Sequence, residues 1–383
     1  MNTTWNLDVM YKGYDDPKYI NDIKKVEETI TKIKELKLDE NNPIKTIEAS
    51  LVLTEELNTL LMELFSYSSL RSSTNVNDFE AMTEMGKLQI MLQETVESDV
   101  LFQSFLTKFN LDDLAKESNL IKIYLFLLKK QQEEATHMLS EKEEILASKL
   151  KMVGSNSWSD LQSQLTSNIM IKVEGFDELM PLSAVRSLAY SANKEERINA
   201  YNAELEAYKQ IDSSVAMALN NIKREVNIMM PLRGYEDALS KTLKQSNVSI
   251  ETLNAMIEAI KDERENFRRY FKLKAKALGY KNGLPFYELF APIGSLTRTY
   301  SIDEAKELIL DVYKSFSNEL YEMGKTAFEN RWIDFLPKEG KVGGAFCASL
   351  DNHHESRVLT NFTGSLGDVQ TLAHELDTLC SAY

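Results

Sequence analysis

The feature that most constrains the fold is an apolar stripe at helical spacing in the middle of the chain. Its members recur three and four positions apart, which is the repeat of one face of an α-helix: Tyr201, Leu205, Tyr208, Ile211, Val215, Leu219, Ile222 and Val226. This stripe predicts a single helix long enough to cross a core. Glycine is also rare between Gly13 and Gly234, and the 383 residues contain only seven prolines. We therefore expect a mainly α-helical protein.

Further helices are expected on both sides of the stripe. The apolar pattern predicts helix after helix over residues 18–152 and another long helix over 249–279. Ser301 and Glu304 have the spacing of a capping box, in which each side chain bonds the backbone N–H of the other residue. This signature predicts a helix that runs from Ser301 to about Gly324.

Strands are predicted in only a few places. Residues 167–175 alternate between apolar and polar side chains, which is typical of a short strand with one buried face. Two more short strands, Ala345–Leu350 and Arg357–Phe362, precede the last helix of the chain. We expect these two strands to form a small sheet beside that helix.

Charge and cysteine usage exclude several classes of protein. The formal net charge is −15, whereas a nucleic acid or an anionic membrane requires a basic face. No apolar run reaches the length of a membrane span, and the first residues do not form a signal peptide. Cys347 and Cys380 are too few for a disulfide framework, and we interpret both as small buried side chains rather than nucleophiles. The expected location is the cytoplasm.

The last helix carries the chemistry. A β-branched strand, a Thr-Gly-Ser break and an amphipathic helix containing His374 and Glu375 follow one another, as at the start of a zinc-peptidase site. In an HExxH motif, histidines at i and i+4 reach one zinc ion, and the glutamate is the general base for the metal-bound water. Here Thr378 occupies the i+4 position. Leu372 and Leu376 lie on the face that such a helix would bury.

Two other histidines, His353 and His354, lie in a polar turn between the two predicted strands. Neighbouring residues on a turn point in different directions, so they seldom share a metal ion. We interpret them as a solvated turn. A rearrangement that brings one of them to His374 is the alternative.

Several blocks together resemble the oligoendopeptidase F branch of the thimet-oligopeptidase-like zinc metallopeptidases. The blocks extend from the start of the chain to Leu376: Trp5-Asn-Leu-Asp, Leu232-Arg-Gly-Tyr-Glu-Asp-Ala-Leu, Arg331-Trp-Ile-Asp, Gly343-Gly-Ala-Phe-Cys347, and Thr363-Gly-Ser followed by Thr371-Leu-Ala-His-Glu-Leu376. The resemblance implies a two-lobed helical fold around a channel for short peptides. It also implies an N-terminal helical lobe over 1–190, with a strand pair near 167–175, and the first part of a catalytic domain over 191–383.

The resemblance further implies a zinc endopeptidase that hydrolyses internal bonds of short peptides. His374 would be a zinc ligand, and Glu375 would take a proton from the attacking water and return it to the leaving amine. The peptide backbone would add to a strand edge before the motif helix. That edge would come from the segment containing Gly344, Ala345 and Phe346, or from Arg357–Phe362.

The chain departs from the family pattern after Leu376. Asp377 and Thr378 stand where Gly-His is expected, and the later glutamate ligand and the residues that steady the oxyanion would lie beyond Tyr383. Zinc sites need at least three protein ligands. We therefore expect negligible zinc-dependent turnover from this chain, as from a truncated copy. The alternative is a non-catalytic helical peptide-binding protein. Apolar faces left uncovered would make the chain marginally stable or self-associating.

Overall fold

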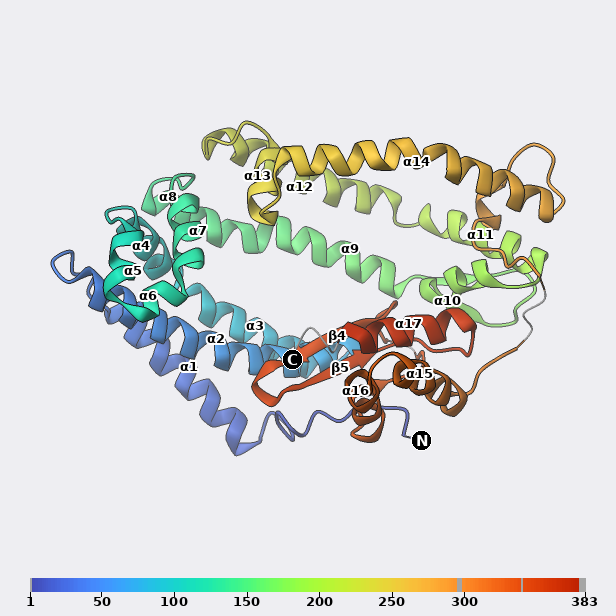
Figure 1. Cartoon of the computed structure of the whole chain (residues 1–383), viewed down its shortest axis with the longest axis horizontal. Coiled ribbons are helices and arrows are strands. Elements are labelled where there is room, and N and C mark those ends of the chain that lie inside the picture. The colour runs from blue at the N-terminus through green and yellow to red at the C-terminus, as the bar shows by residue number, and fades with distance from the viewer. Residues whose placement is uncertain (1, 295–297, 339, 379–383) are drawn as a thin grey trace. The chain divides into compact units, whose positions relative to one another are not determined.

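The computed structural model describes residues 2–294, 298–338 and 340–378. The chain forms two compact units (Figure 1). The first unit joins Met1–Lys149 to Arg298–Tyr383, so it is discontinuous in sequence, and the second unit is Leu150–Thr297. The division into lobes over 1–190 and 191–383 remains a prediction. The compact units divide the chain elsewhere, after Lys149 and after Thr297.

The first unit is built mostly of helices. Its N-terminal part contains α1 Pro17–Glu35, α2 Pro43–Thr74, α3 Phe79–Gln93, α4 Val96–Leu106, α5 Leu111–Glu117, α6 Asn119–Ile123, α7 Leu125–Ala135 and α8 Glu141–Lys151, whose last two residues belong to the second unit. Its C-terminal part contains α15 Ile302–Phe316, α16 Asn318–Glu329 and α17 Leu366–Asp377. The prediction of a mainly helical chain is confirmed.

A three-stranded sheet links the two ends of the first unit. The strands are β3 Ile333–Asp334, β4 Phe346–Leu350 and β5 Glu355–Leu359, in the order β3-β5-β4. β5 pairs antiparallel with β4 (Cys347 opposite Val358) and parallel with β3 (Ile333 opposite Val358). The predicted strands near 345–350 and 357–362 are confirmed, whereas β3 was not predicted because two residues carry no periodicity.

The amino-terminal residues bond directly to the elements around this sheet. The amide of Phe335 donates to the carbonyl of Thr3 (2.9 Å), and the amide of Asn6 donates to the carbonyl of Arg331 (2.8 Å). The buried guanidinium of Arg357 on β5 donates to the carbonyl of Asn6 (2.7 Å). The first unit therefore needs both ends of its sequence to complete one core.

The second unit has its own core. Its helices are α9 Ser157–Asn168, α10 Leu182–Ser187, α11 Lys194–Tyr208, α12 Asp212–Leu232, α13 Ala238–Ser246 and α14 Ile250–Ala277. β1 Met170–Lys172 and β2 Leu179–Pro181 form a hairpin, which confirms the strand predicted within 167–175. A fully buried carboxylate, that of Glu288, accepts two bonds from the guanidinium of Arg197 (2.6 and 3.0 Å). Short π and 3₁₀ turns complete the chain: Met152–Asn156, Leu188–Tyr190, Phe286–Glu288 and Asp351–His353.

Two predicted helices are interrupted, and in both places a polar residue starts a new helix. The stripe over 201–226 is two helices, α11 and α12, because Asp212 and two following serines favour a helix N-terminus over a helix interior. The helix predicted from Ser301 to Gly324 ends at Phe316. Ser317 has extended backbone angles, and its hydroxyl accepts the amides of Glu319 and Leu320, so it caps α16. The capping box at Ser301 itself is confirmed.

Within the described ranges, no helix combines the length and the apolar character that crossing a bilayer requires.

Candidate active site

The turn before α17 fixes where this helix begins. Ser365 is the N-cap, and its hydroxyl accepts the amide of Asp368 (3.0 Å). The carboxylate of Asp368 accepts the amide and hydroxyl of Thr363 (2.9 and 2.8 Å) and the amide of Ser365 (3.0 Å). Gly364 has φ +99° and lies against Tyr300, where a Cβ atom would approach the carbonyl oxygen to 2.9 Å. Both the backbone angle and the close approach require glycine here.

α17 buries one face and exposes its histidine. Val369, Leu372 and Leu376 are buried among the side chains of the first unit's core, as predicted for the two leucines. The hydroxyl of Tyr313 donates to the carbonyl of Ala373 (2.5 Å), which ties α17 to α15. His374 is exposed and Glu375 is half-buried. The two motif residues therefore lie outside the packed face of a well-anchored helix.

Thr378 occupies the position of the second histidine, and its hydroxyl donates to the carbonyl of Glu375 (2.6 Å). This bond caps the end of the helix. Within residues 2–294, 298–338 and 340–378, no three side chains from His, Cys, Asp and Glu lie close enough to hold a metal ion together. The residues near His374 therefore do not fit a zinc site with three protein ligands.

Cys347 lies on β4, close to the end of α17. Burial raises the pKa of its thiol, and the carboxylate of Glu375 raises it further, whereas the hydroxyls of Thr378 and Ser356 act in the opposite direction. A thiol with a raised pKa is a poor nucleophile at neutral pH. Cys347 is half-buried rather than fully buried, and its environment agrees with the interpretation that it is not a nucleophile. Cys380 lies outside the described residues.

The sheet order distinguishes the two predicted peptide-binding edges. β5 lies between β3 and β4, so its residues pair on both sides, whereas β4 is an edge strand of the described sheet (Figure 1). Gly344 is exposed with φ +85°, Ala345 is half-buried, and the ring of Phe346 contacts Trp5 with centroids 6.4 Å apart. Of the two predicted segments, the one that contains these three residues leads into the edge strand of the described sheet, whereas β5 is paired on both sides.

A side-chain amide holds the segment that leads into β4. Asn361, just after β5, donates to the carbonyls of Val342 (3.0 Å) and Gly344 (2.8 Å). No sequence pattern distinguishes Asn361, because an asparagine after a strand is also common in ordinary turns. Its two bonds fix the direction in which the edge strand begins.

The turn between β4 and β5 is anchored on α2 by a buried carboxylate. Glu63 is 7% exposed and accepts bonds from Nε2 of His353 (2.6 Å), Nζ of Lys18 (3.0 Å) and Nδ2 of Asn352 (3.3 Å). Burial alone would raise the pKa of Glu63, but the bonds from His353 and Lys18 outweigh it, and the pKa lies below its ordinary value. The expectation of a solvated turn is therefore wrong for His353, which is a structural partner of Glu63.

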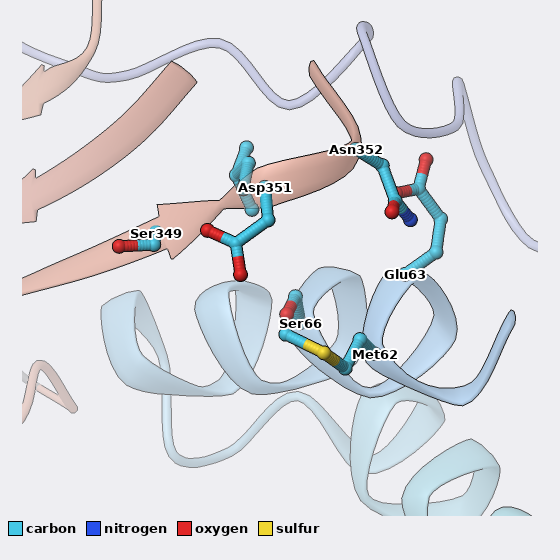
Figure 2. Close-up of a pocket in the computed structure, with 7 residues that line it drawn as sticks. Met62, Glu63, Ser66, Ser349, Asp351 and Asn352 are labelled. Carbon is cyan, nitrogen blue, oxygen red and sulfur yellow. The ribbon is translucent and has the colours of Figure 1, made fainter. Parts of the chain in front are cut away.

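The sequence contained one signal for this anchor. Glu63 stands between Leu61 and Leu64, two core positions of α2, where an unpaired charge would be costly. Figure 2 shows Glu63 and Asn352 facing each other beside a small pocket that Met62, Ser66, Ser349 and Asp351 also line. Its volume of about 10 Å³ accommodates about one water molecule, which is too small for a peptide.

A larger hollow of about 400 Å³ lies within the second unit and is lined by Leu161, Gln164, Leu165, Asn168, Ile169, Met170, Gln210 and Ile211. No acid, base or nucleophile lines it.

The sequence matches two family models over most of its length. Residues 187–376 match peptidase family M3, and residues 106–170 match the oligopeptidase F model. The chain belongs to peptidase family M3, in its oligoendopeptidase F branch. The resemblance found in the sequence motifs is thus confirmed.

Curated relatives match nearly the whole chain. The oligoendopeptidase F homolog of Lactococcus lactis subsp. lactis is 24% identical over 97% of this chain, and oligopeptidase PepF of Bacillus subtilis is 23% identical over 99%. This chain covers 63% and 57% of the lengths of these two proteins. It therefore spans about three fifths of the curated relatives it matches.

Solved structures share the fold. The oligoendopeptidase-F of Enterococcus faecium superposes with a TM-score of 0.65 at 14% identity, covering 82% of this chain and 65% of that one. PZ peptidase A, solved with an inhibitor, superposes with a TM-score of 0.68 at 14% identity, covering 97% and 64%. Identities this low establish the fold and nothing further.

Proposed function

We propose that this chain derives from a zinc oligopeptidase, binds short peptides in extended form along the edge of β4, and has negligible zinc-dependent turnover. Membership of peptidase family M3 supports the ancestry. The observation that carries the proposal is the arrangement of α17, where His374 and Glu375 come after the antiparallel pair of β4 and β5 but Thr378 stands in place of the second histidine. Glu375 would be the general base and His374 a zinc ligand in a complete site.

The edge of β4 supports the peptide-binding part of the proposal. An edge strand presents N–H and C=O groups that an extended peptide can pair with, so affinity comes from the main chain and selectivity from neighbouring side chains. Gly344, Ala345 and Phe346 lead into this edge, and Asn361 holds the lead-in in place. Short unfolded peptides are therefore the proposed ligands.

The donor set opposes zinc-dependent catalysis by this chain. A threonine hydroxyl is a poor ligand for zinc, and that of Thr378 is already bonded to a backbone carbonyl. His374 is one ligand, because Glu375 would be the general base, and protein zinc sites use at least three protein ligands. The proposal therefore assigns this chain no hydrolytic step.

Composition supports the proposed partners and cellular location. A net charge of −15 disfavours nucleic acid and anionic membranes as partners, and two cysteines suit the reducing cytoplasm. The second candidate function is peptide binding without catalysis. The same edge strand favours it. It differs from the first candidate in that peptide binding is the function itself, rather than what remains of a peptidase.

The test compares zinc binding and peptide cleavage in three chains. These are the parent, Thr378→His, which restores the second histidine, and Thr378→Ala, which removes the hydroxyl without adding a ligand. We expect no stoichiometric zinc in the parent or in Thr378→Ala by calorimetry and metal analysis, and weak binding in Thr378→His. A quenched fluorescent peptide should bind the parent, as read by fluorescence anisotropy, without being cleaved.

Two outcomes contradict this proposal. One tightly bound zinc ion in the parent, with peptide cleavage that a chelator abolishes, would show that other side chains complete the site. Absence of peptide binding at any concentration tested would remove the role assigned to β4.

A further inference from the structure

The helix α14 is exposed around its whole circumference for most of its length. It spans 28 residues (Figure 1), and every residue from Asn254 to Tyr270 is exposed. Only its ends are held: the hydroxyl of Ser249 caps the first turn, and Nζ of Lys274 donates to the carbonyl of Leu289 (2.7 Å). Helices gain most of their stability from packing an apolar face, so a long stretch without packing calls for a covering partner.

One face of this exposed stretch is apolar. Leu253, Met256, Ile257, Ile260, Phe267 and Phe271 recur three, four and seven positions apart, which places them along one side of the helix. Met256, Ile260 and Phe267 are 58%, 61% and 59% exposed. An exposed apolar strip of this kind marks an interaction surface. The centre of the strip is interrupted by two charged residues, Glu263 and Arg264.

The two halves of α14 carry opposite charge. The half up to residue 263 contains four acidic residues and one lysine, a net charge of −3: Glu251, Glu258, Asp262, Glu263 and Lys261. The half from residue 264 contains six basic residues and one glutamate, a net charge of +5: Arg264, Arg268, Arg269, Lys272, Lys274, Lys276 and Glu265. The sign changes between Glu263 and Arg264, at the middle of the helix.

We propose that the apolar face of α14 is a homodimer interface, on which a second copy of this chain docks its own α14 in antiparallel orientation about a two-fold axis between Glu263 and Arg264. A two-fold interface pairs the same patch on both subunits. In the antiparallel arrangement each acidic half lies on the partner's basic half. A parallel arrangement would instead place like charges together, which is unfavourable.

The proposed axis also matches the apolar residues. If residue 263 faces residue 264 of the other copy, Ile260 faces the partner's Phe267 and Met256 faces the partner's Phe271. Glu263 and Arg264 form two symmetric ion pairs at the centre, and Arg269 faces the partner's Glu258. Charges at the centre of an apolar seam fix its register and orientation. In the single chain, Glu263 bonds only the amide of Asn266 on its own helix, an exposed contact that an ion pair can replace.

This inference is independent of the proposed peptidase ancestry. The other candidate to cover the apolar face of α14 is a polypeptide that corresponds to the part of the relatives that this chain does not match. The antiparallel self-complementarity of charge favours the second copy, because it is a property of α14 against itself.

The experiment is sedimentation velocity of the full 383-residue chain over a range of concentrations. We expect a species of twice the 43.8 kDa monomer mass that weakens as salt rises, since the charge contribution is screened. Ile260→Lys should shift the equilibrium to monomer, because it buries two lysines in the seam. Leu273→Lys is the matched control: Leu273 is 67% exposed on the opposite side of the same helix, and its replacement should leave the dimer intact.

A charge exchange tests the register. Glu263→Arg and Arg264→Glu should each weaken dimerisation at least tenfold, because each places like charges across the axis. The double variant E263R/R264E restores opposite charges and should recover the parent's dissociation constant.

Circular dichroism checks that each variant remains helical. A parent chain that stays monomeric, or a dimer that the charge exchange does not restore, overturns the proposal. A monomer also overturns the proposal if its α14 binds, in trans, a separate polypeptide that corresponds to the unmatched two fifths of a relative.

Discussion

α17 and α14 are both amphipathic helices with a serine N-cap, but they differ in what covers their apolar faces. Leu372 and Leu376 of α17 have no exposed area and lie in the core of the first unit. Ile260 and Phe267 of α14 are about 60% exposed. The same sequence pattern therefore serves intramolecular packing in one helix and supplies an open surface in the other. An amphipathic pattern predicts that a face will be buried, and it does not say by what.

The sharpest test of this comparison removes one leucine from each helix. Leu372→Ala should lower the free energy of unfolding by about 2–5 kcal/mol, because it leaves a cavity in a packed core. Leu273→Ala, at an exposed position of α14 outside the apolar strip, should change it by less than about 0.5 kcal/mol. Urea titration followed by tryptophan fluorescence reports both units, since Trp5 and Trp332 are buried in the first and Trp158 lies on α9 of the second. Equal changes in the free energy of unfolding for the two variants would contradict the difference in packing between α17 and α14.

A smaller effect is expected at the anchor of the sheet beside α17. His353→Ala removes a donor from the buried carboxylate of Glu63 and should cost about 1–3 kcal/mol at neutral pH. Exposed His354, the next residue, supplies the control His354→Ala, which should have a smaller effect than His353→Ala.

The carboxylate of Glu63 also makes the stability of the fold depend on pH, and the direction of that dependence can be predicted. The pKa of Glu63 is lowered in the folded protein, so its contribution to stability is fully present above the ordinary value of 4.5 and is lost as pH falls through the lower folded value. The parent should therefore be more stable than Glu63→Gln at neutral pH and lose that advantage in acid. An advantage that persists unchanged well below pH 4 would show that Glu63 is not charged in the fold.

The smallest effect comes from the two caps. Ser365→Ala should cost about 1 kcal/mol, because α17 unfolds together with its core. Ser249→Ala removes the equivalent bond from α14 but should fray only an exposed first turn. The urea midpoint measures the effect of Ser365→Ala. Hydrogen exchange of the first-turn amides of α14 measures the effect of Ser249→Ala. A shift of the urea midpoint by Ser249→Ala as large as that caused by Ser365→Ala would mean that the first turn of α14 unfolds together with a packed core.

Local features of the fold were accessible from the sequence. Turn chemistry located the capping box at Ser301, and helical spacing identified the buried face of α17 through Leu372 and Leu376. The motif His374-Glu375, in its context of strand and turn, led to the correct family. Each of these signals lies within a few residues of the structure that it predicts.

Features that depend on distant partners were not accessible. Glu63 and His353 are 290 residues apart, so no local pattern links them. β3 has two residues, and only its parallel pairing with β5 defines it as a strand. The breaks at Asp212 and Ser317 were missed because apolar spacing continued through them, while the polar side chains started new helices.

The bonds between the two ends of the first unit have a consequence for synthesis on the ribosome. Thr4 accepts a bond from Arg331, 327 residues later, and Asn6 accepts one from Arg357. At a translation rate of about 5–20 residues per second, roughly 16–65 s separate the emergence of the first partner from that of the second. During that interval Trp5, Met10 and Tyr11 lack the partners that the last strands provide. The nascent chain thus presents an unfinished core to chaperones and proteases until the sheet is translated.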